Sequence, residues 1–213
     1  MTHSKTKSSQ SIRAQGFEVS QSPHSENNVV ALQEEIRSLK RQNEDLRSSL
    51  HEDDLTGLYN ARALRERLGE ILSAQKTTHE NMALLFIDVD RFKDVNELHG
   101  HQAAGRVLEQ IGRLIGRVIR THDIAFRYGG DEFVVLVSGG NFGARLVGER
   151  IRKSIEAHRF KVSGLQGEAH IQVTVSIGAR TLKSDDTMDS LLESADRAMF
   201  EAKRNSRNAF VAA

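Results

Sequence analysis

Apolar and polar residues alternate from Asp53 onward in a way that predicts a series of helices and strands. Leucines and isoleucines between residues 58 and 72 recur at helical spacing, whereas ALLFIDVD at residues 83–90 is an almost continuous apolar run that predicts a buried strand. A long helix is expected next. Its apolar face comprises Ala104, Val107, Leu108, Ile111, Leu114, Ile115, Val118 and Ile119.

The second half of the chain continues this alternation. Two short strands are expected at Ile124–Arg127 and Phe133–Val137, and Gly129 and Gly130 between them predict a tight hairpin, because glycine reaches positive φ without steric cost. A helix at about 142–158, a strand at Val173–Ala179, a helix at about 187–204 and a last short strand follow. Strands that alternate with helices predict a layered domain of the α/β or α+β class.

Residues 29–50 carry apolar residues in a heptad repeat instead. Its a positions are Val29, Ile36, Asn43 and Leu50, and its d positions are Leu32, Leu39 and Leu46. Branched residues at a with leucine at d favour a parallel two-stranded coiled coil, and one asparagine at an a position fixes the register. We therefore expect a coiled-coil dimerisation helix over residues 29–52. A single amphipathic helix packed on its own domain is the alternative, because the run is only about three heptads long.

Composition narrows the classes of protein that the chain can belong to. Residues 1–28 are polar and have few apolar side chains, so we expect a disordered tail there. The net charge of +1 gives no strong field for nucleic acid or a membrane surface, and we expect neither as a partner. The absence of cysteine excludes disulfides and thiolate metal sites. No apolar run has the length of a membrane span or a signal peptide, so a cytoplasmic location is expected.

Acidic side chains stand at two points where they can meet. Asp88 and Asp90 end the apolar strand, and Asp131 and Glu132 lie at the tip of the predicted hairpin. Carboxylates that converge repel one another unless a hard divalent cation such as Mg²⁺ neutralises them, and such a cation suits phosphoryl chemistry. The alternative is that these acids only solvate the ends of loops.

Basic side chains could complete a phosphate site. No GxxxxGK[ST] sequence is present, so a P-loop is excluded. Lys203 and Arg207 are four residues apart, which predicts that they share one face near the end of the last helix. A lysine–arginine pair on a helix is more often a solvated face than a ligand site.

Five motifs resemble those of the GGDEF family of diguanylate cyclases, in the order and spacing of that family over about residues 53–211. They are DLTGLYN (54–60), FIDVDRFKDVNELHGH (86–101), RYGGDEF (127–133), VTVSIGA (173–179) and AMFEAKRNSRN (198–208). The resemblance implies a polymerase-palm-like, nucleotidyl-cyclase-like fold, a central antiparallel sheet surrounded by helices. It also implies a catalytic domain over residues 53–213 behind the N-terminal coiled-coil helix.

The same resemblance implies roles for individual residues. Asp88 and Asp131 are expected to bind two Mg²⁺ ions, or Mn²⁺, with the Val89 carbonyl as a further ligand. Glu132 is expected to bind metal or help to activate the 3′-hydroxyl. Gly129 and Gly130 would let the hairpin backbone approach the nucleotide. Triphosphate contacts are expected from Phe92, Lys93, Lys203 and Arg207, and base or ribose contacts from Asn96 and His101.

The implied reaction joins two GTP molecules into cyclic di-GMP with release of pyrophosphate. Each domain binds one GTP, so two domains must face each other, and the coil at residues 29–50 would tether a homodimer. Arg120 and Asp123 form an RxxD motif that, with Arg150, implies an inhibitory site for cyclic di-GMP. A simple ion pair at the end of a helix is the alternative for Arg120 and Asp123.

One substitution departs from the family pattern. Gly105 stands where the family has an aspartate that reads guanine, and the loss of such an acceptor costs about 1–3 kcal/mol. Guanine preference should therefore weaken, and the resemblance implies a variant that accepts ATP and makes a cyclic AMP–GMP hybrid as an alternative. Water could instead fill the place beside Gly105 with GTP still preferred, since Asn96 keeps part of the guanine contact. Two other interpretations remain: a catalytically weak receptor for cyclic di-GMP that acts through Arg120 and Asp123, and a coiled-coil interaction module whose globular part is only a scaffold.

Overall fold

The computed structural model describes residues 32–40, 51–78, 81–164 and 167–213. The chain divides into two units, Met1–Leu46 and Arg47–Ala213. In the first unit residues 32–40 are helical, as predicted. The expected disordered tail at residues 1–28 and four of the heptad positions, Val29, Asn43, Leu46 and Leu50, lie outside the described residues.

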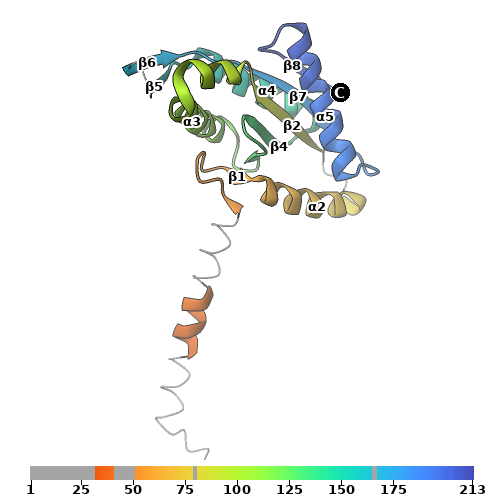
Figure 1. The fold of residues 1–213 in the computed structure, drawn as a ribbon. Coiled ribbons are helices and arrows are strands. Elements are labelled where there is room, and N and C mark those ends of the chain that lie inside the picture. The colour runs from red at the N-terminus through yellow and green to blue at the C-terminus, as the bar shows by residue number, and fades with distance from the viewer. Residues whose placement is uncertain (1–31, 41–50, 79–80, 165–166) are drawn as a thin grey trace, which may run out of the picture. The chain divides into compact units, whose positions relative to one another are not determined.

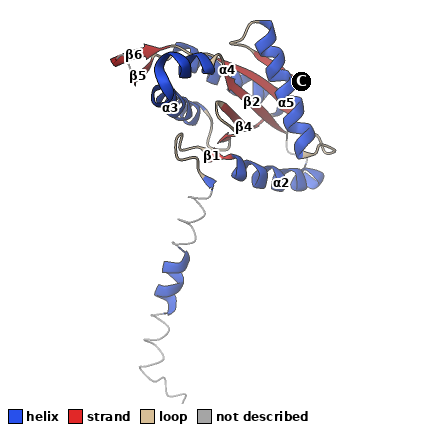
Figure 2. Ribbon diagram, viewed as in Figure 1, coloured by secondary structure: helices blue, strands red, loops and turns tan. Residues whose placement is uncertain are grey.

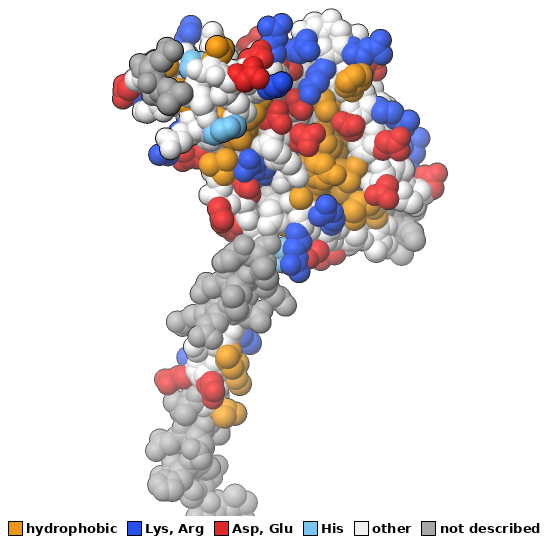
Figure 3. Space-filling model, in the orientation of Figure 1, with side chains coloured by type: hydrophobic (Ala, Val, Ile, Leu, Met, Phe, Trp, Pro, Cys, Tyr) orange, Lys and Arg blue, Asp and Glu red, His pale blue; other side chains and the backbone are white. Residues whose placement is uncertain are grey.

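The described helix of the first unit exposes its apolar positions. Leu32, Ile36 and Leu39 are 61%, 46% and 58% exposed, and they form the orange stripe on this helix in Figure 3.

The second unit is built on a six-stranded mixed sheet (Figures 1 and 2). Its four central strands are antiparallel, as predicted, whereas both edge strands run parallel to their neighbours. The strand order is β1 (Tyr59–Asn60), β3 (Ile124–Arg127), β4 (Glu132–Ser138), β2 (Met82–Val89), β7 (Val175–Thr181) and β8 (Phe210–Ala212).

Helices cover both faces of this sheet, which confirms the α+β class. Helices α3 (Phe92–Val118) and α4 (Gly140–Ala157) pack on the face that carries Leu85 and Ile87 of β2. Helices α2 (Ala61–Thr78) and α5 (Met188–Asn205) pack on the opposite face, with Leu84 and Phe86. Side chains alternate along a strand, so Asp88 of β2 belongs to the face that α5 covers.

Three features differ from the sequence predictions. A hairpin of β5 (Phe160–Gly164) and β6 (Gly167–Ile171) was not predicted. Helix α3 begins at Phe92, well before the predicted apolar face, and is interrupted at Gly100, where φ is 81° and ψ is 163°. The two-residue strand β1 was also missed.

No helix in the described parts of the chain has the length and apolar character needed to cross a membrane. On the face of the globular unit that Figure 3 shows, red acidic and blue basic side chains are interspersed.

Candidate functional site

The acidic end of β2 lies against the acidic hairpin, as predicted. Asp88 is the direct cross-strand partner of Glu132 in the register of β2 and β4. One residue further along, the Val89 N–H donates a hydrogen bond of 3.2 Å to the Asp131 carbonyl. Antiparallel pairing therefore brings the two acidic segments to the same edge of the sheet.

Helix α5 adds a cation to these carboxylates. The Lys203 ammonium lies 2.7 Å from Asp88 Oδ1, and both side chains are largely buried, at 26% and 10% exposure. A capping box between Thr187 and Ser190 fixes the start of α5, with hydrogen bonds of 2.9 and 3.1 Å. The direct pairing of Lys203 with Asp88 could not be read from the sequence.

The pKa values of two carboxyls at this site, Asp88 and Glu132, are raised. Burial raises the pKa of the Asp88 carboxyl to about 6 from its ordinary value of 3.8; the Lys203 ammonium opposes this shift, and the Asp131 and Glu132 carboxylates add to it. The pKa of Glu132 is raised as well, first by burial and then by the charges of Asp131 and Asp196, against the effect of Lys203. Asp196 of α5 is an acidic neighbour that the sequence analysis missed.

The side chain of Arg127 connects the hairpin to Asp53 by hydrogen bonds. Arg127 donates to the carbonyls of Gly129 and Gly130, at 2.9–3.3 Å. Its Nη1 also donates to both carboxylate oxygens of Asp53, at 3.1 and 3.0 Å. Asp53 in turn accepts from the backbone N–H and hydroxyl of Thr56, at 2.9 and 2.7 Å. The hairpin tip is therefore fixed to the segment that opens the globular unit.

One of the two reasons predicted for the hairpin glycines, a positive φ, does not hold, whereas their expected approach to a nucleotide stays a prediction. Neither Gly129 nor Gly130 has a positive φ, so the expectation of a turn that needs glycine's φ range is wrong. A β-carbon on Gly129 would lie 2.6 Å from Glu132 Oε2, because that side chain folds back over the turn. A β-carbon on Gly130 would meet no atom within 4 Å.

The first turns of α3 carry four predicted ligand residues. Phe92 is buried, so only its backbone can contact a ligand. The side chain of Lys93 is 86% exposed, and its Nζ lies 3.5 Å from Glu97 Oε1. His101 Nδ1 lies 3.0 Å from Asn96 Oδ1, so the two residues expected at the base or ribose are brought together.

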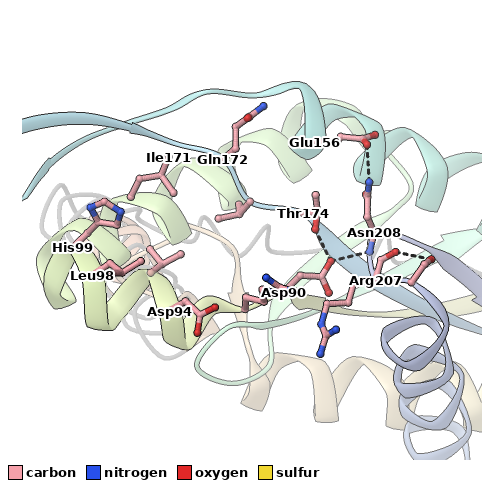
Figure 4. A pocket seen from close by; sticks show the side chains of 14 residues that line it. Asp90, Asp94, Leu98, His99, Glu156, Ile171, Gln172, Thr174, Arg207 and Asn208 are labelled. Atoms are coloured by element: carbon pink, nitrogen blue, oxygen red, sulfur yellow. Dashed lines mark hydrogen bonds between the residues drawn. The ribbon is translucent and has the colours of Figure 1, made fainter.

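Arg207 does not lie where the sequence pattern placed it. Helix α5 ends at Asn205, and Arg207 follows it with a φ of 54°. The prediction that Lys203 and Arg207 share one helix face is therefore wrong. Instead, Arg207 lines a cavity of about 570 Å³ together with Asp90, Arg91 and Asn208 (Figure 4).

Asp90 also differs from its sequence neighbour Asp88. Its carboxylate is buried and accepts hydrogen bonds from Thr174, Ser176 and the backbone of Asn208. Asp88 and Asp90 both stand at the end of the apolar run, but their side chains have different partners.

Gly105 lies on α3 with free space beside it. A β-carbon there would meet only Leu55 Cδ1, at 3.8 Å, which is an ordinary contact distance. A longer side chain therefore has room at this position.

The RxxD motif forms a tight turn and not an ion pair. Asp123 is buried and accepts from the backbone N–H groups of Arg120, at 2.9 Å, and Ser138, at 3.4 Å. No ion pair joins Asp123 to Arg120 in the part of the chain that the structure describes, so the simple ion-pair alternative is wrong. Arg120 and Arg150 are exposed.

The donor chemistry at the end of β2 fits a hard divalent cation. In the described ranges no three His, Asp or Glu side chains are clustered tightly enough to hold a metal ion. However, burial raises the pKa of Asp88 to about 6, and the Asp131 and Glu132 carboxylates also act electrostatically on Asp88, so a cation beside these groups would stabilise their charged forms. Carboxylate and carbonyl oxygens are the ligands that Mg²⁺ takes, and Asp88, Asp131 and the Val89 carbonyl could supply them.

Solved structures of known proteins share this fold. The coiled coil and GGDEF domain of DgcB from Caulobacter crescentus, in complex with c-di-GMP, matches with a TM-score of 0.79 at 28% identity, over 88% of this chain and 98% of that one. Diguanylate cyclase SiaD from Pseudomonas aeruginosa, in complex with its activator SiaC, matches with a TM-score of 0.77 at 31% identity, over 89% of this chain and 72% of that one.

Sequence relatives lead to the same family. Diguanylate cyclase A of Treponema denticola is 40% identical over 131 residues, which are 61% of this chain and 34% of the relative. Diguanylate cyclase DgcM of Escherichia coli K12 is 33% identical over 190 residues, which are 87% of this chain and 44% of the relative. The chain thus spans less than half the length of these relatives. The family model for the diguanylate cyclase GGDEF domain matches residues 50–209, and with the paired acidic strand and hairpin this shows that the chain belongs to the GGDEF family of diguanylate cyclases.

Proposed function

We propose that the protein is a diguanylate cyclase that condenses two GTP molecules into cyclic di-GMP and two pyrophosphates. The observation that carries this proposal is the meeting of Asp88 with the acidic hairpin of Asp131 and Glu132, with the Lys203 ammonium 2.7 Å from Asp88 Oδ1. Such a site suits a triphosphate that arrives with divalent metal, because metal and substrate together balance the carboxylates.

The reaction is an in-line displacement. The 3′-hydroxyl oxygen of one GTP forms a bond to the α-phosphorus of the other, the bond from that phosphorus to the bridging oxygen breaks, and pyrophosphate leaves with the electron pair. A second displacement of the same kind, by the 3′-hydroxyl of the other nucleotide on the remaining α-phosphorus, closes the ring and releases the second pyrophosphate. Mg²⁺ bound at Asp88 and Asp131 supplies charge neutralisation on the phosphate oxygens. Glu132, whose pKa burial raises, accepts or relays the proton of the hydroxyl.

Cations of the chain hold the substrate. The Lys203 ammonium, 2.7 Å from Asp88 Oδ1, would neutralise phosphate oxygens of a triphosphate held beside Asp88. The backbone at Phe92, the ammonium of Lys93 and the guanidinium of Arg207 contact the outer phosphates. The N-terminus of α3 favours these anions through its unpaired N–H groups.

A test of this function needs only purified protein and mass spectrometry. The protein is incubated with Mg²⁺ and GTP, ATP or both, and the products are resolved by mass. We expect cyclic di-GMP from the wild type, none from Asp131→Ala, and a normal yield from Asp185→Ala, which removes an exposed acid on the loop before α5. Equal yields from wild type and Asp131→Ala would rule the proposal out.

The product spectrum also tests base choice. Gly105 supports relaxed purine recognition, because glycine has no side chain that could accept from the guanine edge at this position. In mixtures of GTP and ATP we therefore expect the cyclic AMP–GMP hybrid beside cyclic di-GMP. A spectrum that contains cyclic di-GMP alone would contradict relaxed recognition but not the cyclase activity.

We further propose that residues 29–50 tether two chains as a homodimer. The exposed apolar stripe of Leu32, Ile36 and Leu39 supports this, and a tether gives the second domain an effective concentration of about 1 mM. The double variant Leu39→Glu, Leu46→Glu should be inactive at nanomolar protein concentration and should regain part of its activity at high protein concentration. If the specific activity of this double variant does not change on dilution, the tether is refuted.

We also propose product inhibition at Arg120 and Arg150, with Asp123 as the residue that shapes the turn. Both arginines are exposed, and Asp123 fixes the backbone beside Arg120. Arg120→Ala should keep the initial rate and lose inhibition by added cyclic di-GMP. If the wild type binds cyclic di-GMP through these arginines but makes none, the receptor interpretation replaces the cyclase.

A further inference from the structure

The turn that follows α5 has an unusual backbone. Arg207 and Asn208 have φ values of 54° and 46°, and Arg91 is the only other non-glycine residue with a positive φ in the described residues. Asparagine tolerates the left-handed region, whereas a long side chain such as arginine adopts it at a cost in free energy. Neighbouring groups must therefore hold Arg207 in this conformation.

Asp90 supplies the first of these groups. Its Oδ2 accepts the backbone N–H of Asn208 at 2.9 Å and the Thr174 hydroxyl at 2.6 Å, and its Oδ1 accepts the Ser176 hydroxyl at 2.7 Å. The carboxylate is 6% exposed, and no lysine or arginine forms an ion pair with it among the described residues. Both oxygens are therefore already committed to hydrogen-bond donors of the chain.

Helix α4 holds the same turn from the other side. Arg152 Nη1 donates to Asn208 Oδ1 at 2.8 Å, and Asn208 Nδ2 donates to Glu156 Oε1 at 2.6 Å. Arg152 is itself fixed by Glu149 and Glu156, at 3.0 and 3.1 Å. Figure 4 shows Asn208 between Glu156 and Asp90, with Arg207 next to it at one end of the cavity.

From this arrangement we propose that Asp90 is a positioning residue for Arg207 and not a metal ligand. It fixes the backbone of Asn208, so the left-handed turn directs the Arg207 guanidinium toward the triphosphate. The inference rests on the proposed function, in which Arg207 binds substrate phosphates. It differs from that function in giving Asp90 and Asp88, two residues apart on one strand end, separate tasks.

An asparagine at position 90 separates the two roles. If its amide oxygen takes the place of Oδ2, it still accepts from Asn208 and Thr174, and its NH₂ group donates to the Ser176 hydroxyl, which can reverse its role. The variant Asp90→Asn therefore keeps the turn but loses the negative charge that a metal ligand needs. The variant Asp90→Ala loses both.

The readout is the affinity for a GTP analogue with a methylene bridge between the α- and β-phosphates, measured by calorimetry with Mg²⁺ on the full chain. Arg207→Ala should weaken binding about ten- to a hundredfold, as expected for loss of a charged hydrogen bond. Asp90→Ala should weaken it to a similar degree, and Asp90→Asn by less than about threefold. In the Arg207→Ala background, Asp90→Ala should have almost no further effect.

The outcomes separate the inference from the function on which it rests. Unchanged affinity in Arg207→Ala would refute the phosphate assignment itself. Two results would overturn only the positioning role, provided that Arg207→Ala weakens binding of the analogue as expected. One is that Asp90→Asn binds the analogue as weakly as Asp90→Ala. The other is that the losses of affinity in the double variant are additive.

A second pair of variants covers the case in which Asp90→Ala does not fold. Asn208→Gly keeps the backbone N–H and favours the left-handed turn, whereas Asn208→Val disfavours it because the side chain is β-branched. Asn208→Gly should bind the analogue within about threefold of wild type, and Asn208→Val about tenfold more weakly. Weaker binding by Asn208→Gly than by Asn208→Val would contradict the inference.

Discussion

The raised pKa of Asp88 predicts that removal of its charge stabilises the fold. The carboxyl has a pKa of about 6 in the folded protein and 3.8 ordinarily. A shift of about two units corresponds to about 3 kcal/mol, since each pKa unit represents about 1.4 kcal/mol. The variant Asp88→Asn should therefore unfold with a free energy about 3 kcal/mol larger than the wild type at pH 8.

The sign of the pH dependence follows from proton binding. Because the pKa is higher in the folded state, the folded protein binds the Asp88 proton more tightly than the unfolded chain. This contribution to stability is fully present below pH 3.8 and is lost as the pH rises through about 6. The advantage of Asp88→Asn should therefore fall to roughly half of its value between pH 8 and pH 5.

Urea unfolding in EDTA, followed by circular dichroism, measures both values. Asp185→Asn serves as the control, because substitution of an exposed acid changes the free energy of unfolding by only about 0.5 kcal/mol or less. An Asp88→Asn protein that is less stable than the wild type at pH 8 would refute the account of the charge at this site, as would an advantage that does not depend on pH.

Two further substitutions test the site more locally. Gly129→Ala should lower activity at least tenfold with an unchanged melting temperature, because its β-carbon would lie 2.6 Å from Glu132 Oε2 and displace that side chain; activity equal to that of the wild type in a pyrophosphate-release assay would contradict this. Gly105→Asp has room beside Leu55 and should raise the preference for GTP over ATP by about 1–3 kcal/mol, or roughly five- to a hundredfold in kcat/KM; an unchanged ratio would show that this position does not read the base.

Local patterns predicted the elements that build the site. The apolar run at residues 83–90 became β2 at Met82–Val89, and the strand expected at Ile124–Arg127 has those bounds in the structure. Buried strands can be predicted from such runs because burial on both faces of a sheet leaves little room for polar residues. The missed hairpin of β5 and β6 has shorter apolar runs, with only Phe160, Val162 and Ile171 buried.

Side-chain direction and backbone conformation were the parts that the sequence could not give. The spacing of Lys203 and Arg207 indicates a shared helix face only if the helix continues, and α5 ends between them. The turn after α5 is bound to Asp90, which is 118 residues away from Asn208 along the chain and accepts its N–H, and such a distant partner cannot be found from local spacing. Asp88 and Asp90 likewise look equivalent in the sequence, and only their partners across the sheet separate them.

Metal binding at the carboxylates tests the central claim most directly. Mn²⁺ can replace Mg²⁺ and be counted by electron paramagnetic resonance in the presence of the methylene-bridged GTP analogue. We expect the wild type and Asp185→Asn to bind Mn²⁺ equally well, and Asp88→Asn and Asp131→Asn each to bind it at least tenfold more weakly. Unchanged Mn²⁺ binding in both Asp88→Asn and Asp131→Asn would contradict the claim that the end of β2 and the hairpin form one metal site.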